Sequence, residues 1–290
     1  MGIRTLQQVI PAVPTSDGAG VKLRRSIGSQ RGLYVDPFLM LDEFSTDNPD
    51  DYIAGFPSHP HRGFETVTYM LDGHLLHEDH MGNRGDLKSG GAQWMTAGRG
   101  IIHSEMPQQS AGRMRGFQLW INLPANEKVK PAWYRDIEPE EIPQVALADG
   151  GTAKIIAGTL NVAGVVTCGV ITGRTTDPLY LDVELPNGAP FTHSIHDDYS
   201  AFIYYYEGAG DLLVGAPDAA SALKTRCAGV LSPGDQITAT ADGGSARFLL
   251  IAGKPIKEPV VQYGPFVMNT QAEVEQAVRD YQNGVLAEAV

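Results

Sequence analysis

Residues 58–73, SHPHRGFETVTYMLDG, combine two closely spaced histidines with a strand pattern and a turn. Between residues 64 and 71 apolar and polar side chains alternate, which is typical of a strand with one buried face. The run ends in Asp72-Gly73, a dipeptide that favours the tight turn of a β-hairpin. This stretch therefore predicts antiparallel β structure with the histidine pair directly in front of it.

The same pattern continues along the chain. Short apolar or alternating runs are separated by turn residues, and the 33 glycines and 19 prolines are scattered rather than clustered. These features predict an all-β fold that is rich in turns. A segment rich in proline and acidic residues, from Pro124 to Pro143, predicts a boundary between two similar β domains, residues 1–135 and 136–290.

One stretch near the end of the chain has a helical pattern instead. Thr270 and Glu273 have the spacing of a capping box, in which each side chain bonds the other residue's backbone. Apolar residues then recur at helical spacing. We expect one amphipathic helix at about residues 270–283 that docks on a β domain.

Composition limits the possible partners. A net charge of −12 argues against non-specific binding to nucleic acid or anionic membranes. The basic run at residues 22–25, KLRR, is too short to change this, and we expect it on a solvated strand edge. Two cysteines, Cys168 and Cys227, make neither a disulfide framework nor a zinc–thiolate site. With no apolar run of membrane-spanning length and no signal-peptide pattern, we expect a cytoplasmic protein.

Two residue pairs have the spacing of metal ligands. His59 and His61 lie two residues apart, as do His103 and Glu105. A strand directs residues i and i+2 to one face, so the four side chains would converge if the two strands were neighbours in a barrel. Imidazole suits Fe, Zn, Cu, Ni and Co, and four such ligands leave two positions open on an octahedral ion. A single buried histidine is more often an ordinary core residue, but two such pairs favour a metal site.

Several long segments of the sequence resemble the pirin family, from about residue 24 to the predicted helix and most densely in the first half. These segments are residues 24–28, 36–39, 59–67, 93–107 and 258–270. Pirins are bicupins, with two jelly-roll-like β-barrels in one chain, and their N-terminal barrel holds one iron through three histidines and one glutamate. The resemblance therefore implies a divalent ion, Fe(II), bound by His59, His61, His103 and Glu105. Zn, Mn, Ni, Co and Cu stay open as other ions for this site.

A second glutamate, Glu65, could also be the fourth ligand. The general cupin pattern is H-x-H, three residues and then Glu, and Glu65 satisfies it. The pirin pattern favours Glu105, which leaves Glu65 to bond a ligand imidazole or a substrate hydroxyl, or to act as a base.

The remaining histidines are expected outside the site. His193 and His196 lie three residues apart, which is wrong for one strand face, and no second metal site is expected there. His74, His77 and His80 follow the Asp72-Gly73 turn, where we expect a solvated loop, with His77 or His80 pointing at the pocket as the alternative.

The resemblance implies two alternative functions. Bacterial pirins resemble quercetinases, which open the central ring of a flavonol with O2, so one expectation is a dioxygenase for a small aromatic or enediol-like substrate that chelates the metal. Eukaryotic pirins are iron-dependent co-regulators of transcription factors, so the other is a binding protein with a protein partner and no turnover. G-x-S-x-G, Walker and G-x-G-x-x-G motifs are absent, so hydrolase, NTPase and dinucleotide functions lack support.

Overall fold

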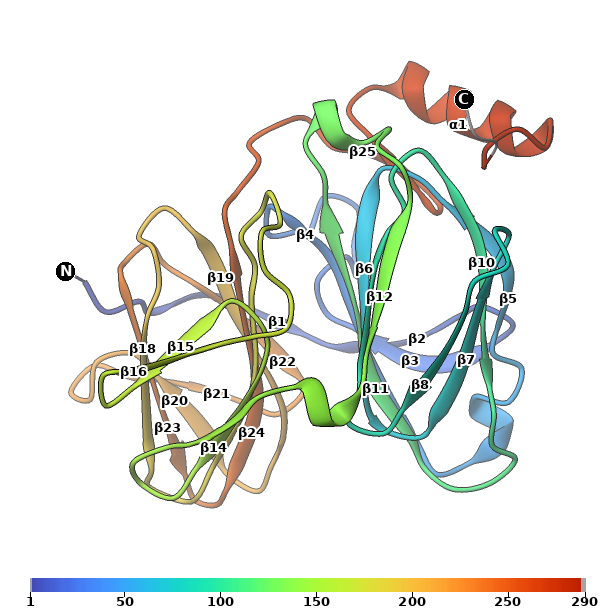
Figure 1. Ribbon diagram of the computed structural model, residues 1–290. Coiled ribbons are helices and arrows are strands. Elements are labelled where there is room, and N and C mark those ends of the chain that lie inside the picture. The colour runs from blue at the N-terminus through green and yellow to red at the C-terminus, as the bar shows by residue number, and fades with distance from the viewer. Residues whose placement is uncertain (1, 288–290) are drawn as a thin grey trace. The chain divides into compact units, whose positions relative to one another are not determined.

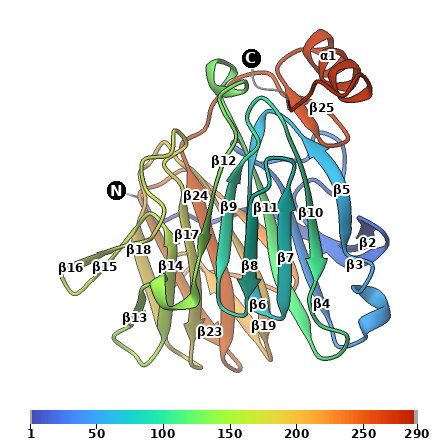
Figure 2. The same cartoon turned by 45° about the vertical axis from the view of Figure 1, so that its right-hand side comes forward.

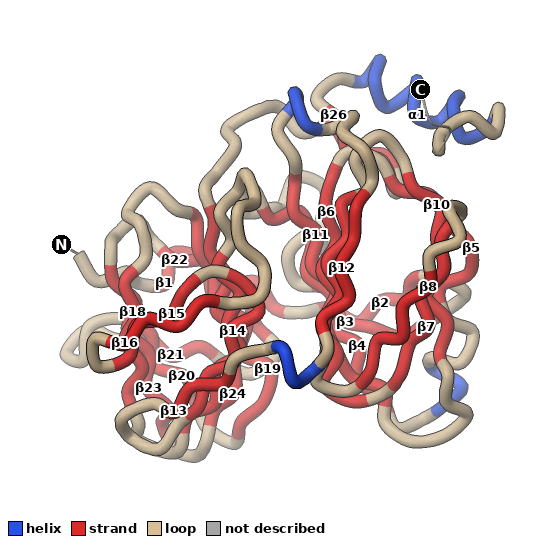
Figure 3. Tube along the Cα trace, in the orientation of Figure 1, coloured by secondary structure: helices blue, strands red, loops and turns tan. Residues whose placement is uncertain are grey.

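The computed structural model describes residues 2–287, which fold into two compact units of mainly antiparallel strands (Figures 1 and 3). We call them the N-terminal barrel and the C-terminal barrel. The N-terminal barrel comprises Val13–Tyr34, Phe38–Pro139 and the chain from Ile256 onward. The C-terminal barrel comprises the chain up to Ala12, Val35–Pro37 and Glu140–Pro255. The prediction of an all-β fold with two barrels and a C-terminal helix is confirmed.

The two units divide the chain differently from the expected boundary between residues 135 and 136. The start of the chain belongs to the C-terminal barrel, and the last part of the chain belongs to the N-terminal barrel. Strand β1 (Leu6–Pro11) pairs with β22 (Cys227–Leu231), which places the start of the chain in the C-terminal barrel. Helix α1 (Gln271–Gln282) packs on β26 (Phe266–Met268), and both belong to the N-terminal barrel. The pairing of β1 with β22 and the packing of α1 on β26 therefore decide which barrel each end of the chain belongs to.

The N-terminal barrel has two main sheets, and Figure 2 shows the smaller one in front. The larger sheet has the order β12 (Trp133–Ile137), β9 (Ala92–Thr96), β6 (Phe64–Asp72), β11 (Met114–Asn122), β4 (Phe38–Thr46), β3 (Val21–Arg25) and β2 (Val13–Asp17). The smaller sheet has the order β5 (Phe56–His61), β10 (Ile101–Pro107), β7 (His74–Asp79) and β8 (Arg84–Lys88). A hairpin of β25 (Val261–Tyr263) and β26 precedes α1, and short 3-10 helices cover Pro49–Asp51, Ala125–Glu127 and Pro139–Glu141.

The C-terminal barrel repeats this arrangement of a seven-stranded and a four-stranded sheet. The larger sheet has the order β1, β22, β19 (Ser200–Gly208), β24 (Ala246–Gly253), β17 (Leu179–Leu185), β14 (Thr152–Ala157) and β13 (Gln144–Ala146). The smaller sheet has the order β18 (Pro190–Ser194), β23 (Gln236–Asp242), β20 (Asp211–Val214) and β21 (Ser221–Leu223). A separate hairpin joins β15 (Thr159–Val162) to β16 (Val165–Cys168). A continuous apolar core that includes Leu181, Phe191, Ile203 and Phe248 fills this barrel.

Helix α1 begins as the sequence predicts. The Thr270 hydroxyl accepts from the Glu273 N–H, and the Glu273 carboxylate accepts from the Thr270 N–H, which completes the capping box. Buried Ala277 on the helix joins a small apolar cluster with Phe266 of β26, and Ile102 of β10 packs against this cluster. Among the helices in the described part of the chain, none has the length and apolar character that a membrane span requires.

The C-terminal segment is tied to the loop that follows His61. Arg62 pairs with Asp280 at 2.6 Å between Nη1 and Oδ2. The buried Lys128 ammonium donates to the carbonyl oxygens of Gly63 and Val267 at 2.8 and 3.0 Å. These bonds fix the turn between β5 and β6, and with it the histidine-bearing end of β5.

Gly63 offers a test of this connection. Its φ is +91°, and an added Cβ would lie 2.0 Å from the Val267 carbonyl oxygen. Gly82 is a matched control, because its φ is +82° and nothing lies within 4 Å of its added Cβ. Both alanine variants bear the strain of a left-handed residue, about 1–2 kcal/mol. We expect Gly63→Ala to lower the free energy of unfolding by at least about 2 kcal/mol more than Gly82→Ala, since it adds a backbone clash.

Urea unfolding followed by tryptophan fluorescence measures this difference, because Trp94, Trp120 and Trp133 all belong to the N-terminal barrel. Equal losses in the two variants would show that the close approach of Val267 to Gly63 is not held in solution.

Candidate metal centre

The two predicted ligand pairs lie on neighbouring strands of the smaller sheet. Strand β10 pairs with β5 so that His103 is opposite His59 and Ile101 is opposite His61. Along β10, His103 and Glu105 are buried while the intervening Ser104 is only half-buried. This alternation directs His103 and Glu105 to the interior of the barrel, as the i, i+2 spacing predicts.

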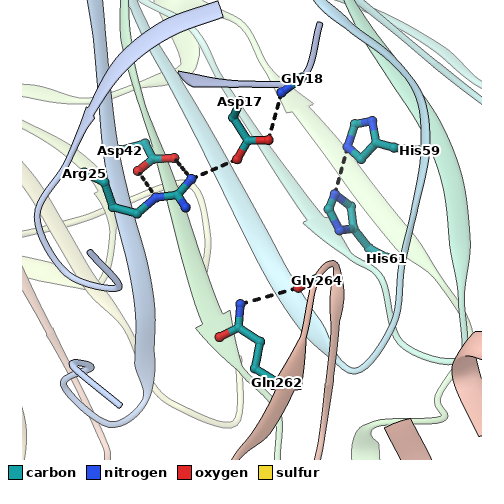
Figure 4. A network of polar contacts seen from close by, with 8 residues as sticks. All are labelled: Asp17, Gly18, Arg25, Asp42, His59, His61, Gln262 and Gly264. Atoms are coloured by element: carbon teal, nitrogen blue, oxygen red, sulfur yellow. Dashed lines mark hydrogen bonds and ion pairs between the residues drawn. The ribbon is translucent and has the colours of Figure 1, made fainter. Parts of the chain in front are cut away.

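The three imidazoles converge on one point. One ring nitrogen from each of His59, His61 and His103 lies within 4.8 Å of those of the other two. The Nε2 atoms of His59 and His61 are 3.0 Å apart, and Figure 4 shows these two nitrogens pointing toward each other. The ring centroid of His103 lies 4.4 Å from the ring centroid of His59 and 4.9 Å from that of His61.

The far nitrogens of two of these rings have partners that orient them. Nδ1 of His59 lies 2.8 Å from the Pro57 carbonyl oxygen, which can only accept, so Nδ1 carries the hydrogen and Nε2 keeps its lone pair. Nδ1 of His103 lies 2.8 Å from Nε2 of His77. The buried Nε2 of His103 has no hydrogen-bond partner among the described residues. Such an orphaned nitrogen facing two other imidazoles is the arrangement that a metal ion would satisfy.

His77 corrects an expectation, because it is 1% exposed rather than part of a solvated loop. On β7 it pairs directly with Glu105 of β10, and paired residues of antiparallel strands point to the same face. For His103 to offer an Nε2 lone pair, its Nδ1–H must donate to His77, so His77 acts as the acceptor that fixes the tautomer. The sequence gives His77 a place at the pocket only as the alternative to a solvated loop, because the register between β7 and β10 is not visible in the sequence.

Burial keeps the inner histidines in the neutral form that binds metal. It lowers the pKa of His61 well below its ordinary value, and the neighbouring His59 adds to this, while the Pro265 backbone opposes it. The pKa of His103 is also well lowered, mainly by burial and further by His61 and His59. Neutral imidazoles hold lone pairs available at near-neutral pH.

Glu105 lies on the wall of the cavity that His59 and His61 also line. Its Oε1 is 3.1 Å from the Thr68 hydroxyl, and that hydroxyl is 2.5 Å from Oε1 of Gln118. The hydroxyl has one hydrogen, so it donates to Glu105 when the Gln118 amide is turned with its nitrogen toward Thr68. This chain of bonds orients the Glu105 carboxylate.

The structure does not bring Glu65 together with the histidines. The Glu65 carboxylate accepts from Trp94 Nε1 at 3.1 Å and from the Thr96 hydroxyl at 2.6 Å. It lies on the opposite face of β6 from Thr68, which lines the cavity. Strand β5 ends at His61 and β6 starts at Phe64 in the other sheet, so the turn separates Glu65 from the histidines although Glu65 satisfies the spacing of the general cupin pattern.

The donor set fits a divalent transition-metal ion. Two nitrogens bound at about 2.1 Å and at a right angle to each other lie about 3.0 Å apart, which matches the 3.0 Å between Nε2 of His59 and Nε2 of His61. Three neutral imidazoles suit Fe(II), Zn, Mn, Ni, Co or Cu, and they do not discriminate strongly among these ions. Glu105 is not part of the group of ligand atoms that lie within 4.8 Å of one another, so its role as the fourth ligand stays a prediction. Thiolate ligands, which structural zinc sites favour, do not contribute: Cys168 is exposed and Cys227 belongs to the other barrel.

We expect His77→Phe to lower metal affinity about tenfold to a hundredfold, because the aromatic ring keeps the volume but cannot accept from His103. His77→Gln retains an acceptor oxygen, and we expect it to recover part of the affinity. Anaerobic competition with a chelator of known affinity for Fe(II) measures this. His74→Phe on the same strand is the control, since His74 is partly exposed and pairs with Asp86. Equal affinities in His77→Phe and the parent protein would exclude the tautomer-fixing role.

The cavity beside the histidines is large enough for a three-ring aromatic molecule. Its volume is about 990 Å³, and all of its lining residues belong to the N-terminal barrel. Trp120 stands beside His61 with ring centroids 5.3 Å apart, and Leu39 and Phe44 add further apolar surface. The β25–β26 hairpin closes part of the wall with Val261, Gln262 and Pro265. Apolar walls with a few polar groups are typical of a small-molecule site.

Two barrels of this type, with a histidine cluster inside the first, define a bicupin. The family model described as Pirin matches residues 20–121, and the model described as Pirin C-terminal cupin domain matches residues 180–287. The chain belongs to the pirin family.

Named relatives extend this similarity over nearly the whole chain. A Pseudomonas aeruginosa protein named "Putative quercetin 2,3-dioxygenase" is 53% identical over 274 residues, which cover 94% of this chain and 95% of that protein. Human pirin is 43% identical over 271 residues, covering 92% and 89%. The crystal structure of quercetin 2,3-dioxygenase from Acinetobacter baumannii matches with a TM-score of 0.87 and 30% identity, covering 99% of this chain and all of that one.

Proposed function

We propose that this protein is a metal-dependent dioxygenase that opens the central ring of a flavonol, or of a similar chelating substrate, with O2. The observation that carries the proposal is the convergence of three imidazole nitrogens, two of them from histidines that line a cavity of about 990 Å³. The names of the relatives from Pseudomonas aeruginosa and Acinetobacter baumannii support the choice of reaction. The ion is Fe(II) in this proposal, as the resemblance implies.

His59, His61, His103 and Glu105 would hold the ion. When bound, the ion would lower the pKa of a chelating hydroxyl of the substrate and so favour its anion. The surrounding bonds already orient two of these imidazoles, through Pro57 for His59 and His77 for His103. These two ligands therefore need little rearrangement to bind the ion.

Glu105 is the proposed acceptor of the substrate proton. Its carboxylate lines the cavity, and Thr68 holds one of its oxygens, which leaves the other for a proton or for the ion. Trp120 offers an aromatic face beside His61 on which a planar substrate can stack.

An oxygen-electrode assay tests the proposal. Anaerobically purified protein loaded with Fe(II) should consume one O2 for each quercetin that disappears, because a dioxygenase transfers both oxygen atoms to its substrate. Loaded protein that binds quercetin but consumes no O2 would refute the proposed reaction.

The alternative function, a binding protein that modulates a partner without turnover, is supported by the resemblance to human pirin. The cavity with its metal ligands favours the enzyme, because a surface for a macromolecule needs no interior space of this size. Purification of the chain with a stoichiometric protein partner, together with no turnover of any flavonol, would favour the alternative.

A further inference from the structure

A second polar cluster lines the same cavity as the histidines. It consists of Arg25, Asp42 and Asp17, on the larger sheet, whereas His59 and His61 lie on the smaller sheet. Figure 4 shows this cluster on one side and the two histidines on the other. Arg25 corrects the expectation of a solvated strand edge at residues 22–25, because its side chain is 22% exposed and reaches the cavity.

Two carboxylates hold the Arg25 guanidinium in place. Arg25 on β3 is directly opposite Asp42 on β4, and Nε and Nη2 each donate to one Asp42 oxygen at 2.7 Å. Nη2 also donates to Oδ2 of Asp17 at 2.8 Å. A bidentate pair with a 3% exposed carboxylate is rigid, since neither partner can rotate without losing charge-assisted bonds.

This arrangement leaves one nitrogen of the Arg25 guanidinium, Nη1, without a hydrogen bond. Nη1 of Arg25 makes no hydrogen bond to any residue in the described chain, although Nε and Nη2 are both engaged. Because Asp42 fixes the plane of the guanidinium, the direction of the Nη1 hydrogens is fixed as well. On Asp17, Oδ2 is the oxygen that bonds to Arg25, while Oδ1 accepts from the Gly18 N–H and keeps capacity for a further donor.

The charge of the cluster narrows the class of ligand. One guanidinium and two carboxylates sum to a net charge of −1, so a carboxylate or sulfate on the ligand would be repelled. A neutral hydroxyl suits both groups chemically, because it can accept from the Arg25 Nη1–H and can donate to an Asp17 oxygen. The bonds to Asp42 and Asp17 raise the pKa of Arg25 above its ordinary value against the effect of burial, so the donor is always charged.

We propose that Arg25 and Asp17 form a subsite for neutral phenolic hydroxyls on the part of the substrate that lies away from the metal ligands. This rests on the proposed function in one respect, that a chelating aromatic molecule occupies the cavity. The substrate would place its chelating oxygens at the histidines and a hydroxylated ring at Arg25. Asp42 positions Arg25 and does not itself contact the ligand.

Two flavonols that differ only in the hydroxyls of the terminal ring test the contribution of the subsite to binding. Quercetin carries two hydroxyls on its terminal ring, and galangin is the same flavonol without them. We expect the Fe(II)-loaded protein to bind quercetin about tenfold to a hundredfold more tightly than galangin. Calorimetric titration without O2 measures both dissociation constants without turnover.

Two variants then test whether the preference for quercetin over galangin depends on Arg25 and Asp17. Asp17→Asn changes a half-exposed side chain and leaves the Arg25–Asp42 pair intact. Arg25→Lys keeps the charge but removes the fork. In each variant we expect the preference for quercetin to fall to about twofold while the affinity for galangin stays unchanged. Arg24→Lys, one residue away and on the opposite face of β3, is the control and should retain the full preference.

Several outcomes would overturn the subsite. One is equal binding of quercetin and galangin by the parent protein, and another is a preference that survives both substitutions. A parallel loss of affinity for both flavonols would assign Arg25 a purely structural role. If Arg25→Lys does not fold, Asp17→Asn decides alone. A preference that depends on Arg25, in a protein that consumes no O2, would uphold the subsite while refuting the proposed reaction.

Discussion

His61→Ala should abolish metal binding and flavonol cleavage together. His61 is 3% exposed, and its Nε2 lies 3.0 Å from Nε2 of His59, so alanine removes a central donor of the cluster. We expect metal content to fall from one ion per chain to below about a tenth, because only two of the three converging imidazole nitrogens remain, fewer than the three protein ligands usual at a catalytic site. Turnover of quercetin should fall at least about a thousandfold, since metal activation contributes several kcal/mol to such a reaction.

Elemental analysis of protein purified without chelators, paired with O2 uptake, measures both effects. The control is His74→Ala, which removes a partly exposed imidazole on β7 that pairs with Asp86 and should retain metal and activity. O2 uptake with quercetin by metal-free His61→Ala protein would disprove the metal-dependent mechanism.

The two glutamates should behave in opposite ways when each is changed to glutamine. Glu105→Gln keeps an oxygen for the Thr68 bond but cannot accept a proton, so we expect kcat to fall about a hundredfold to ten-thousandfold. Metal affinity should fall as well, because a neutral amide is a weaker ligand than a carboxylate. Glu65→Gln should leave both properties within about twofold and instead lower the free energy of unfolding by about 1–3 kcal/mol, since one buried acceptor of Trp94 or Thr96 is lost.

Steady-state kinetics at saturating Fe(II), with urea unfolding of both variants, separates the two roles. Each of the two variants is the control for the other, because both replace a glutamate of the N-terminal barrel by glutamine. A large fall in kcat for Glu65→Gln, with Glu105→Gln unaffected, would transfer the catalytic role to the residue that spacing alone suggested.

The sequence predicts those parts of the site that depend on local periodicity. The i, i+2 spacing anticipates that His59 and His61 share one strand, as do His103 and Glu105, because the alternation of side chains is a property of a single strand. The capping box at Thr270 is predictable for the same reason, since its bonds span only three residues.

Features that depend on the pairing of distant strands are not predictable from spacing. His77 reaches His103 because β7 pairs with β10 in one particular register. Arg25 reaches the cavity because Asp42 lies opposite it on β4. The turn at Gly63 directs β5 and β6 into different sheets, which separates Glu65 from the histidines despite its suitable spacing. In each case the deciding interaction joins segments whose contact is set by the whole barrel.

The most direct test of the proposed mechanism is a titration of metal-free protein with Fe(II), in which O2 uptake with quercetin is measured at each metal occupancy. A single catalytic ion at the cluster of His59, His61 and His103 predicts a rate that rises linearly with bound iron and reaches its plateau at one ion per chain. A rate that is already maximal without metal, or that stays at zero when one ion per chain is bound, would contradict a metal-dependent dioxygenase at His59, His61, His103 and Glu105.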